Sequence, residues 1–334
     1  MMKSIGIIVP YFGSLPNFFR AWTITAKANP TIDFFLFTDD ISNIKSDGNI
    51  HVIPSTLDEV KERIEHVLDK QTLKSIVLSS PYKLCDFRPT YGLSFKDYLE
   101  GYDFWGYCDI DLLFGNIRKF ITNDVLNYCD RYLLNGHLSL YKNCEKMNNL
   151  FKFQESGYPA LNWQDVFFTA DSMYFDEQRG MYTKCMLNQV NIVRETKTCD
   201  PITQEPLFYK GDITSNNQFI VFWKNGNLFM VNKDNHAQEL LYAHFFRRKF
   251  IIESVPENIN RIKVMPTKVV FNEEIKKSDF KLSEKSFYKI CYYCSILKNS
   301  IKKYGLKKTL QRQRWSKDSN AYINEMIYKA NNVK

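Results

Sequence analysis

Two aspartates, Asp109 and Asp111, lie one residue apart in a stretch with Phe104–Tyr107 before them and Leu112–Gly115 after them. Alternation along a strand points two such carboxylates toward the same side, where both can reach one ion. Hard cations such as Mg²⁺ and Mn²⁺ prefer oxygen ligands and often bridge to substrate phosphates. We therefore interpret the pair as a site for a metal ion and a diphosphate.

The flanking residues distinguish this pair from a solvated turn, which is the commoner setting of a lone Asp-x-Asp. The run from Tyr102 to Gly115 has only three charged residues, Asp103, Asp109 and Asp111. Its aromatic and aliphatic residues suit a strand that is covered on both faces. Carboxylates in such a run are costly unless a positive group neutralises them. We expect a buried strand that ends in the two carboxylates.

A histidine followed by cations forms a second cluster. His244 ends the stretch Leu240–His244, and Arg247, Arg248 and Lys249 come shortly after it. Imidazole suits Mn²⁺ better than Mg²⁺, and arginine and lysine bind phosphate. The cluster is either an exposed basic turn or the part that completes a metal–diphosphate site.

Four other residues could carry chemistry upstream of and beyond the acidic pair. Lys83 and Asp86 would share a face of a helical turn that ends at Pro89. They form either a surface ion pair or, with Arg88, a contact to phosphate and sugar. His137 lies in the apolar line 132–141, which we expect to be one strand, and is either a core residue or a ligand contact.

Acidic residues stand beside aromatic rings between positions 155 and 183, where we expect irregular structure. Asp165 follows Trp163, and Asp176 and Glu177 follow Phe175. Rings stack on the apolar faces of sugars, and carboxylates accept hydrogen bonds from hydroxyls. The segment therefore fits a sugar site, and it fits an ordinary acidic loop equally well.

Strands at 4–10, 33–37 and 49–53 alternate with helices at 17–27 and 56–69, which predicts a mostly parallel sheet. Short strands joined by turns are expected between 206 and 232. Ligands bind at the carboxyl ends of parallel strands, and neither a GxGxxG nor a GxxxxGK[ST] motif is present. The residues at those ends are Pro10, Tyr11, Phe12, Gly13, Thr38 and Asp39.

Composition indicates a globular protein of 334 residues, 44% hydrophobic and 15% aromatic. No apolar run approaches the length of a membrane span, and the first residues lack the pattern of a signal peptide. The eight scattered cysteines are expected to be free thiols in a cytosol.

The end of the chain is strongly basic, with fifteen lysines and arginines against four acidic residues from Lys276 onward. Apolar residues between 285 and 305 fall at helical spacing, with lysines largely off that stripe. Such a helix binds an anionic membrane or packs on the main domain. Nucleic acid is a weaker third interpretation, because no nucleic-acid-binding motif accompanies the charge.

Together these segments resemble a bacterial glycosyltransferase of the GT-A fold, of the group encoded in capsule, O-antigen and exopolysaccharide clusters. The resemblance covers roughly residues 4–250 and depends most on the Asp-x-Asp strand and the run from His244 to Lys249. It implies an α/β fold with a single Rossmann-type mixed sheet flanked by helices. The catalytic domain would be 1–275, with a nucleotide-sugar half at about 1–120 and an acceptor half at about 121–275. A basic helical extension would follow at 276–334.

The resemblance also implies a nucleotide-diphospho-sugar donor, expected to be a UDP-hexose such as UDP-galactose or UDP-galactofuranose, bound through Mn²⁺ or Mg²⁺. The acceptor would be a glycan or a lipid-linked oligosaccharide, and nucleic acid would not be a partner. The metal ligands would be Asp109, Asp111 and His244. The acceptor side, with any general base, would be Asp165, Asp176 and Glu177. The donor-binding residues would be Pro10, Tyr11, Phe12, Thr38, Asp39, Lys83, Asp86, Arg88, Asp109, His137, Arg247, Arg248 and Lys249.

Two other classes use similar residues. A metal-dependent nucleotidyltransferase or phosphohydrolase also needs paired aspartates and cations, and a non-catalytic carbohydrate-binding protein would carry the acids as surface features. We expect the protein in the cytoplasm or peripherally on the inner face of the cell membrane.

Overall fold

The computed structural model describes residues 2–42, 44–68, 75–154, 160–200, 208–209, 218–245, 250–252 and 254–280. Contacts divide the chain into two compact units. The first comprises Met1–Thr203 and Leu207–Phe280, and the second comprises Gln204–Pro206 and Lys281–Lys334. Only the first unit contains described residues, so the helix expected at 285–305 lies outside them.

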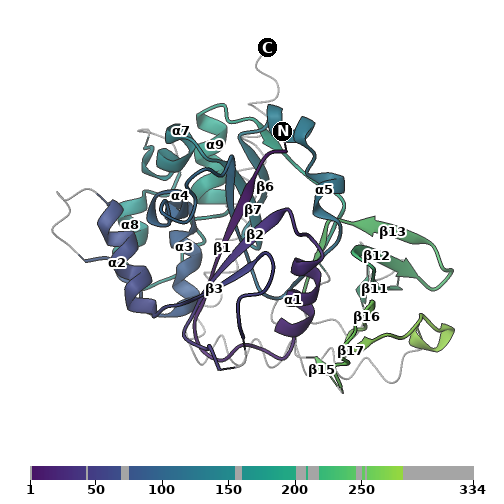
Figure 1. Ribbon diagram of the computed structural model, residues 1–334. Helices are drawn as coiled ribbons and strands as arrows, with labels where there is room; N and C mark the ends of the chain where they lie inside the picture. The colour runs from purple at the N-terminus through teal and green to yellow at the C-terminus, as the bar shows by residue number, and fades with distance from the viewer. Residues whose placement is uncertain are drawn as a thin grey trace, which may run out of the picture. The chain divides into compact units, whose positions relative to one another are not determined.

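A mixed sheet forms the centre of the first unit (Figure 1). The strand order is β3-β2-β1-β4-β7-β6-β8, in which β3, β2, β1 and β4 are mutually parallel and β7 is antiparallel to both neighbours. The parallel strands are nearly continuous apolar runs, as expected when both faces are covered. The bounds are β1 Ile5–Tyr11, β2 Ile32–Thr38, β3 Ile50–Pro54, β4 Phe104–Cys108, β6 Arg131–Asn135, β7 Leu138–Lys142 and β8 Ile192–Val193.

Helices cover both faces of this sheet. Successive residues of a strand face opposite ways, so neighbouring residues of β1 pack against different helices. On one face, Ile8 packs in a core with α2 (Leu57–Val67), α4 (Tyr91–Ser94) and α8 (Trp163–Phe167). On the other face, Ile7 packs with α1 (Phe19–Lys27), α5 (Ile117–Phe120) and α6 (Asn123–Tyr128). The predicted α/β architecture, a mixed sheet flanked by helices, is confirmed.

A second, largely antiparallel sheet accompanies the central one and was not predicted as a separate sheet. Its order is β13-β12-β11-β16-β17-β15, with β10 also paired to β11. Asn225 and Gly226 form the turn of a hairpin between β11 and β12, at φ of 47° and 87°, so the prediction of short strands joined by turns is confirmed for this part. The bounds are β10 Phe208–Tyr209, β11 Gln218–Lys224, β12 Asn227–Asn232, β13 Ala237–Leu240, β15 Ile251–Ile252, β16 Arg261–Val264 and β17 Lys268–Phe271.

A third, small sheet is formed by β5 (Leu112–Phe114), β14 (Tyr242–His244) and β9 (Thr198–Cys199). Strand β14 lies in the middle, antiparallel to β5 and parallel to β9. Its register places His244 opposite Leu112. This pairing brings the late histidine to the residue that follows the acidic pair.

Two predictions about local structure were wrong. The apolar line 132–141 is a hairpin of β6 and β7, with Gly136 and His137 in the turn and a register irregularity in β6 where Leu133 has φ of 68°. The segment 155–183 is not irregular throughout, because its described part contains helical turns. The other helical elements are η1 Pro81–Lys83, α3 Leu84–Phe87, η2 Arg88–Thr90, α7 Glu145–Asn149, η3 Leu150–Lys152, η4 Gln178–Tyr182, α9 Thr183–Leu187 and η5 Lys277–Phe280.

Within the described ranges, no helix is both long enough and apolar enough to cross a membrane. The six cysteines found there are free thiols.

Candidate functional site

The acidic pair lies at the carboxyl end of the parallel part of the central sheet. Strand β4 is wholly buried and ends at Cys108, so Asp109 is the first residue beyond it. Tyr107 pairs with Ile8 of β1, and β1 runs parallel to β2, so the three strands end at one edge. Open α/β sheets bind ligands at this edge. The predicted buried strand ending in carboxylates is confirmed.

His244 joins Asp109 and Asp111 to form a group that fits a divalent cation. Its Nε2 lies 3.5 Å from Oδ1 of Asp111, and one ligand atom from each of the three residues lies within 4.8 Å of the others. Bonds of about 2.1 Å place two ligands of one ion no more than about 4.2 Å apart, so a small side-chain adjustment suffices. Two carboxylates and one imidazole suit Mn²⁺ or Mg²⁺.

Asp200 holds the other ring nitrogen of His244. Its Oδ1 lies 3.1 Å from Nδ1, so a proton on Nδ1 leaves the lone pair of Nε2 directed at the Asp111 side. Burial lowers the pKa of His244, but the hydrogen bond from Asp200 and the charges of Asp111 and Asp109 outweigh it and raise the pKa. Sequence reasoning missed Asp200, because only the pairing of β9 with β14 brings it here.

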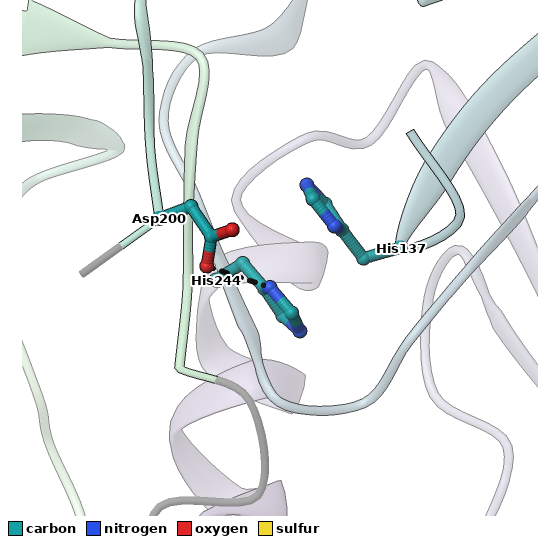
Figure 2. A group of neighbouring side chains, drawn as sticks. All are labelled: His137, Asp200 and His244. Atoms are coloured by element: carbon teal, nitrogen blue, oxygen red, sulfur yellow. Dashed lines mark hydrogen bonds and ion pairs between the residues drawn. The ribbon is translucent and has the colours of Figure 1, made fainter. Parts of the chain in front are cut away.

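His137 also approaches His244 and Asp200, as Figure 2 shows. The two imidazole rings stack 4.2 Å apart with an interplanar angle of 15°. The lone pairs of parallel stacked rings do not converge on one point, so this second group fits a single ion less well. Nε2 of His137 hydrogen-bonds the hydroxyl of Tyr242 at 2.8 Å. Burial and the proximity of His244 lower the pKa of His137 to about 4, so the ring is neutral near pH 7.

Arg88 links the acidic pair to a second set of carboxylates. Its guanidinium donates to Asp109, to Oδ2 of Asp176 at 2.8 Å and to the carbonyl of Gly136, and it lies over the ring of Tyr107. Burial alone would lower the pKa of Arg88, but Asp109 and Asp176 outweigh it and hold the pKa above its ordinary value. Arg88 therefore supplies the positive charge that the buried acids require.

Asp176 and Glu177 meet the turn between β6 and β7. Asp176 is buried, and burial raises its pKa to about 7. Burial also raises the pKa of Glu177. A Cβ at Gly136 would lie only 2.5 Å from Oε1 of Glu177, so the carboxylate of Glu177 lies directly against this turn. The next residue, His137, accepts a hydrogen bond from the Asp109 amide through its carbonyl, at 3.0 Å.

Lys83 and Asp86 have no accessible surface, so the prediction that they contact a donor was wrong. Nζ of Lys83 donates to Asp86 at 2.7 Å and to the carbonyls of Val166 and Asp171. Asp86 accepts the amides of Met173 and Phe175. The ion pair between Lys83 and Asp86 was one of the two predicted possibilities, but the pair is buried beneath the segment that leads to Asp176 and is not on the surface.

The loop ends of β1 and β2 are fastened to one another. Oδ1 of Asp39 accepts the amide of Gly13 at 2.8 Å, and Tyr11 donates its hydroxyl to the carbonyl of Ser14. Thr38 is fully buried, so its side chain is not at the surface of the expected nucleoside site. Phe12 is buried as well. Pro10 lies one residue before the end of β1 and is half-buried.

One predicted residue of the acceptor side is not joined to this group, and three predicted cations cannot be placed. Asp165 lies on the exposed face of α8, and the hydrogen bonds and ion pairs among the described residues do not connect it with Arg88 or the carboxylates. Arg247, Arg248 and Lys249 lie outside the described residues.

Comparison with solved structures finds glycosyltransferases. The apo form of GlyE from Streptococcus pneumoniae TIGR4 is 11% identical at a TM-score of 0.31, over 57% of this chain and 45% of that one. An active-site mutant of LgtC is 12% identical at a TM-score of 0.35, over 73% and 88%. LgtC in complex with donor and acceptor sugar analogs gives 12% and 0.35, over 72% and 87%. This chain thus spans less than half the length of GlyE.

No curated protein matches the sequence. A family model described as a family of unknown function, DUF6625, matches residues 7–273.

Proposed function

Because this chain belongs to the DUF6625 family, whose function is unknown, we propose a function from its own residues. The protein transfers a sugar from a nucleotide-diphospho-sugar to a glycan or lipid-linked oligosaccharide, with the help of a divalent cation. One observation carries this proposal: Asp109, Asp111 and His244 meet at the carboxyl edge of parallel strands. A cation there can bridge to a diphosphate at the place where such sheets bind nucleotides.

The proposal assigns separate roles to the residues that bind the metal ion, the diphosphate and the nucleoside. A bound Mn²⁺ or Mg²⁺ supplies Lewis-acid stabilisation of the departing diphosphate. Asp111 and His244 would hold the ion, and Asp109 would contribute to the ion and to the hydroxyls of the donor. Arg88 fixes one oxygen of Asp109. From the sequence, Arg247, Arg248 and Lys249 are proposed to bind the diphosphate, and the loop ends at Tyr11 and Asp39 to hold the nucleoside.

Glu177 is the proposed proton acceptor for the acceptor hydroxyl if the reaction inverts configuration. Its carboxylate lies against the turn that contacts Asp109, and burial raises its pKa toward the range useful for proton transfer. Asp176 is committed to Arg88. Asp165 has no such connection among the described contacts, so it ranks behind Glu177.

The finer parts of the proposal come from the sequence. The donor is a UDP-hexose, with UDP-galactose and UDP-galactofuranose as the first to test, and the product is a bacterial surface polysaccharide. The basic residues after 275 hold the protein peripherally on the anionic inner face of the membrane.

A thermal-shift and product experiment tests the proposal. UDP-, GDP-, dTDP- and CMP-sugars are each added with Mn²⁺ or with EDTA, and the products are identified by mass spectrometry. A ligand that binds only the folded state raises the melting temperature. We expect a Mn²⁺-dependent shift with one nucleotide class, and a free nucleoside diphosphate when an oligosaccharide is added.

Asp111→Asn should abolish the Mn²⁺-dependent shift and the turnover without unfolding the protein. Asp234→Asn is the matched control, because Asp234 is an exposed residue after β12. Turnover of Asp111→Asn at the wild-type rate would refute the metal assignment. Release of a nucleoside monophosphate would instead identify a nucleotidyltransferase or phosphohydrolase.

A further inference from the structure

We propose that Tyr82 and Tyr174 form a platform that binds the saccharide acceptor by stacking against its sugar rings. The assignment rests on the proposed function, because it names the acceptor subsite of the same site.

The two tyrosines are exposed although large apolar side chains in the described residues are mostly buried. Tyr82 is 42% exposed and Tyr174 is 48% exposed. Their ring centroids lie 6.3 Å apart at an interplanar angle of 79°, and their hydroxyls are 3.3 Å apart. The hydroxyls are in hydrogen-bond contact and the rings are nearly perpendicular, so the pair forms a corner of two aromatic rings and two hydroxyls.

Tyr174 is held in a conformation that a tyrosine seldom adopts. Its φ of 55° lies in the left-handed region, which is unfavourable for a residue with a Cβ. The amides on either side of it, those of Met173 and Phe175, both donate to Asp86, at 2.9 and 2.8 Å. The carbonyl of Tyr174 accepts the amide of Glu177 at 3.1 Å. Such strain persists where the surroundings impose it, and it is common at ligand sites.

One buried ion pair fixes both halves of the corner. Lys83 follows Tyr82 directly, and its ammonium binds the same Asp86 that holds the neighbours of Tyr174. Neither charged side chain has accessible surface. Burying a charge is costly, and here the buried pair positions two exposed rings from segments far apart in the sequence.

The segment that carries Tyr174 also carries residues of the proposed catalytic group. Two residues after Tyr174, Asp176 binds Arg88, which also binds Asp109. Glu177, the next residue, lies against Gly136. A sugar on the tyrosines would therefore be held by the same segment that carries Glu177, the proposed proton acceptor. This segment is separate from the loop ends of β1 and β2, which are assigned to the nucleoside.

The chemistry of the corner selects neutral sugars. Tyrosine presents an apolar face and a polar tip, and a sugar ring presents an apolar face edged with hydroxyls. The hydroxyls of both tyrosines can donate to and accept from such hydroxyls. Hexose rings therefore match both parts of the corner.

Saturation-transfer NMR with lactose and with maltotriose, on the full chain, tests the platform. Tyr82→Ala and Tyr174→Asn should weaken binding of the sugar that the wild type binds by about tenfold or more, as is usual for a central tyrosine contact. Asparagine tolerates the left-handed conformation, so Tyr174→Asn removes the ring without forcing the backbone to change. Tyr174→Phe should retain most of the binding.

Tyr128→Ala is the matched control, because Tyr128 on α6 is 80% exposed and should leave sugar binding unchanged. Equal binding by wild type, Tyr82→Ala and Tyr174→Asn would overturn the platform, and so would a wild type that binds neither sugar. The Mn²⁺-dependent nucleotide shift is measured on the same samples. If that shift fails while the tyrosine-dependent sugar binding remains, the proposed transfer reaction is wrong and the sugar site stands.

Discussion

The hydrogen bond between Asp200 and His244 decides which ring nitrogen of His244 faces the acidic pair. Carboxylates that bind the second nitrogen of a metal-ligating histidine fix its tautomer and its orientation. Asp200 is more than half exposed, whereas His244 is buried. Because its Oδ1 is bound to Nδ1 of His244, we expect the carboxylate to act on an ion at Asp109 and Asp111 through the imidazole, as a positioning residue.

Asp200→Ala should weaken Mn²⁺ binding by about 10- to 100-fold, because the His244 ring loses its tautomer preference. The affinity is measured by isothermal titration of the folded protein with Mn²⁺. Asp234→Ala, at another exposed aspartate, controls for the loss of one surface charge. An unchanged affinity in Asp200→Ala would show that the hydrogen bond does not position the ligand.

The resemblance to GT-A glycosyltransferases grouped Asp109, Asp111 and His244, and the structure brings their ligand atoms together. Residue types and flanking patterns alone left His244 either in an exposed basic turn or in a metal–diphosphate site. They were not enough to predict Asp200 or the link from Arg88 to Asp176, because these partners depend on which strands and loops meet. For Lys83 and Asp86, a three-residue spacing predicted the ion pair, but spacing along a helical turn does not tell whether that turn is covered.

At the scale of elements, the turn η1 and helix α3 support the segment from Asp171 to Glu177. That segment has no regular structure before η4, and its backbone groups must find partners elsewhere. Lys83 and Asp86 supply several of them, through the carbonyl of Asp171 and the amides of Met173 and Phe175. The order of this segment therefore depends on a buried ion pair.

Asp86→Ala should lower the free energy of unfolding by about 3–5 kcal/mol, because it leaves Lys83 as an uncompensated buried charge. Urea denaturation followed by fluorescence measures the change. Asp97→Ala is the comparison, because it breaks the exposed ion pair with Arg63, which should contribute no more than about 1 kcal/mol. Equal losses in the two variants would contradict the buried-pair argument.

Strands β1, β2 and β3 were predicted to within about two residues, because apolar runs bounded by turn residues specify both type and extent. The hairpin of β6 and β7 was not predicted, because its turn lies inside a continuous apolar line and its register irregularity has no sequence signal. The small sheet β5-β14-β9 was missed for a related reason: short strands that pair across long separations leave no local periodicity.

At the scale of the whole molecule, charge separates along the sequence. The formal net charge is +8, and the basic excess lies after residue 275, so the preceding part is close to neutral. An uneven distribution of this kind favours an anionic surface as a partner for the basic part. The attraction is electrostatic and should fall with added salt.

Replacing Lys285, Lys289, Lys298, Lys302 and Lys303 with glutamine in the full chain should strongly reduce sedimentation with phosphatidylserine-containing vesicles. Each lysine near an anionic membrane contributes about 1 kcal/mol. Phosphatidylcholine vesicles serve as the neutral control and should bind neither protein. Undiminished binding to the anionic vesicles would refute the membrane role of this segment.

The small sheet β5-β14-β9 imposes an order of events on folding. Strand β5 follows the acidic pair directly, yet its partner β14 comes far later, and the contact between His137 and Tyr242 joins residues 105 positions apart. Contacts of such long range form late and slowly. During synthesis, β5 must wait with an unpaired edge, a liability for aggregation, until residues 242–244 have been made. The proposed metal ligands therefore come together only in a nearly finished first unit, and an interrupted chain carries Asp109 and Asp111 without His244.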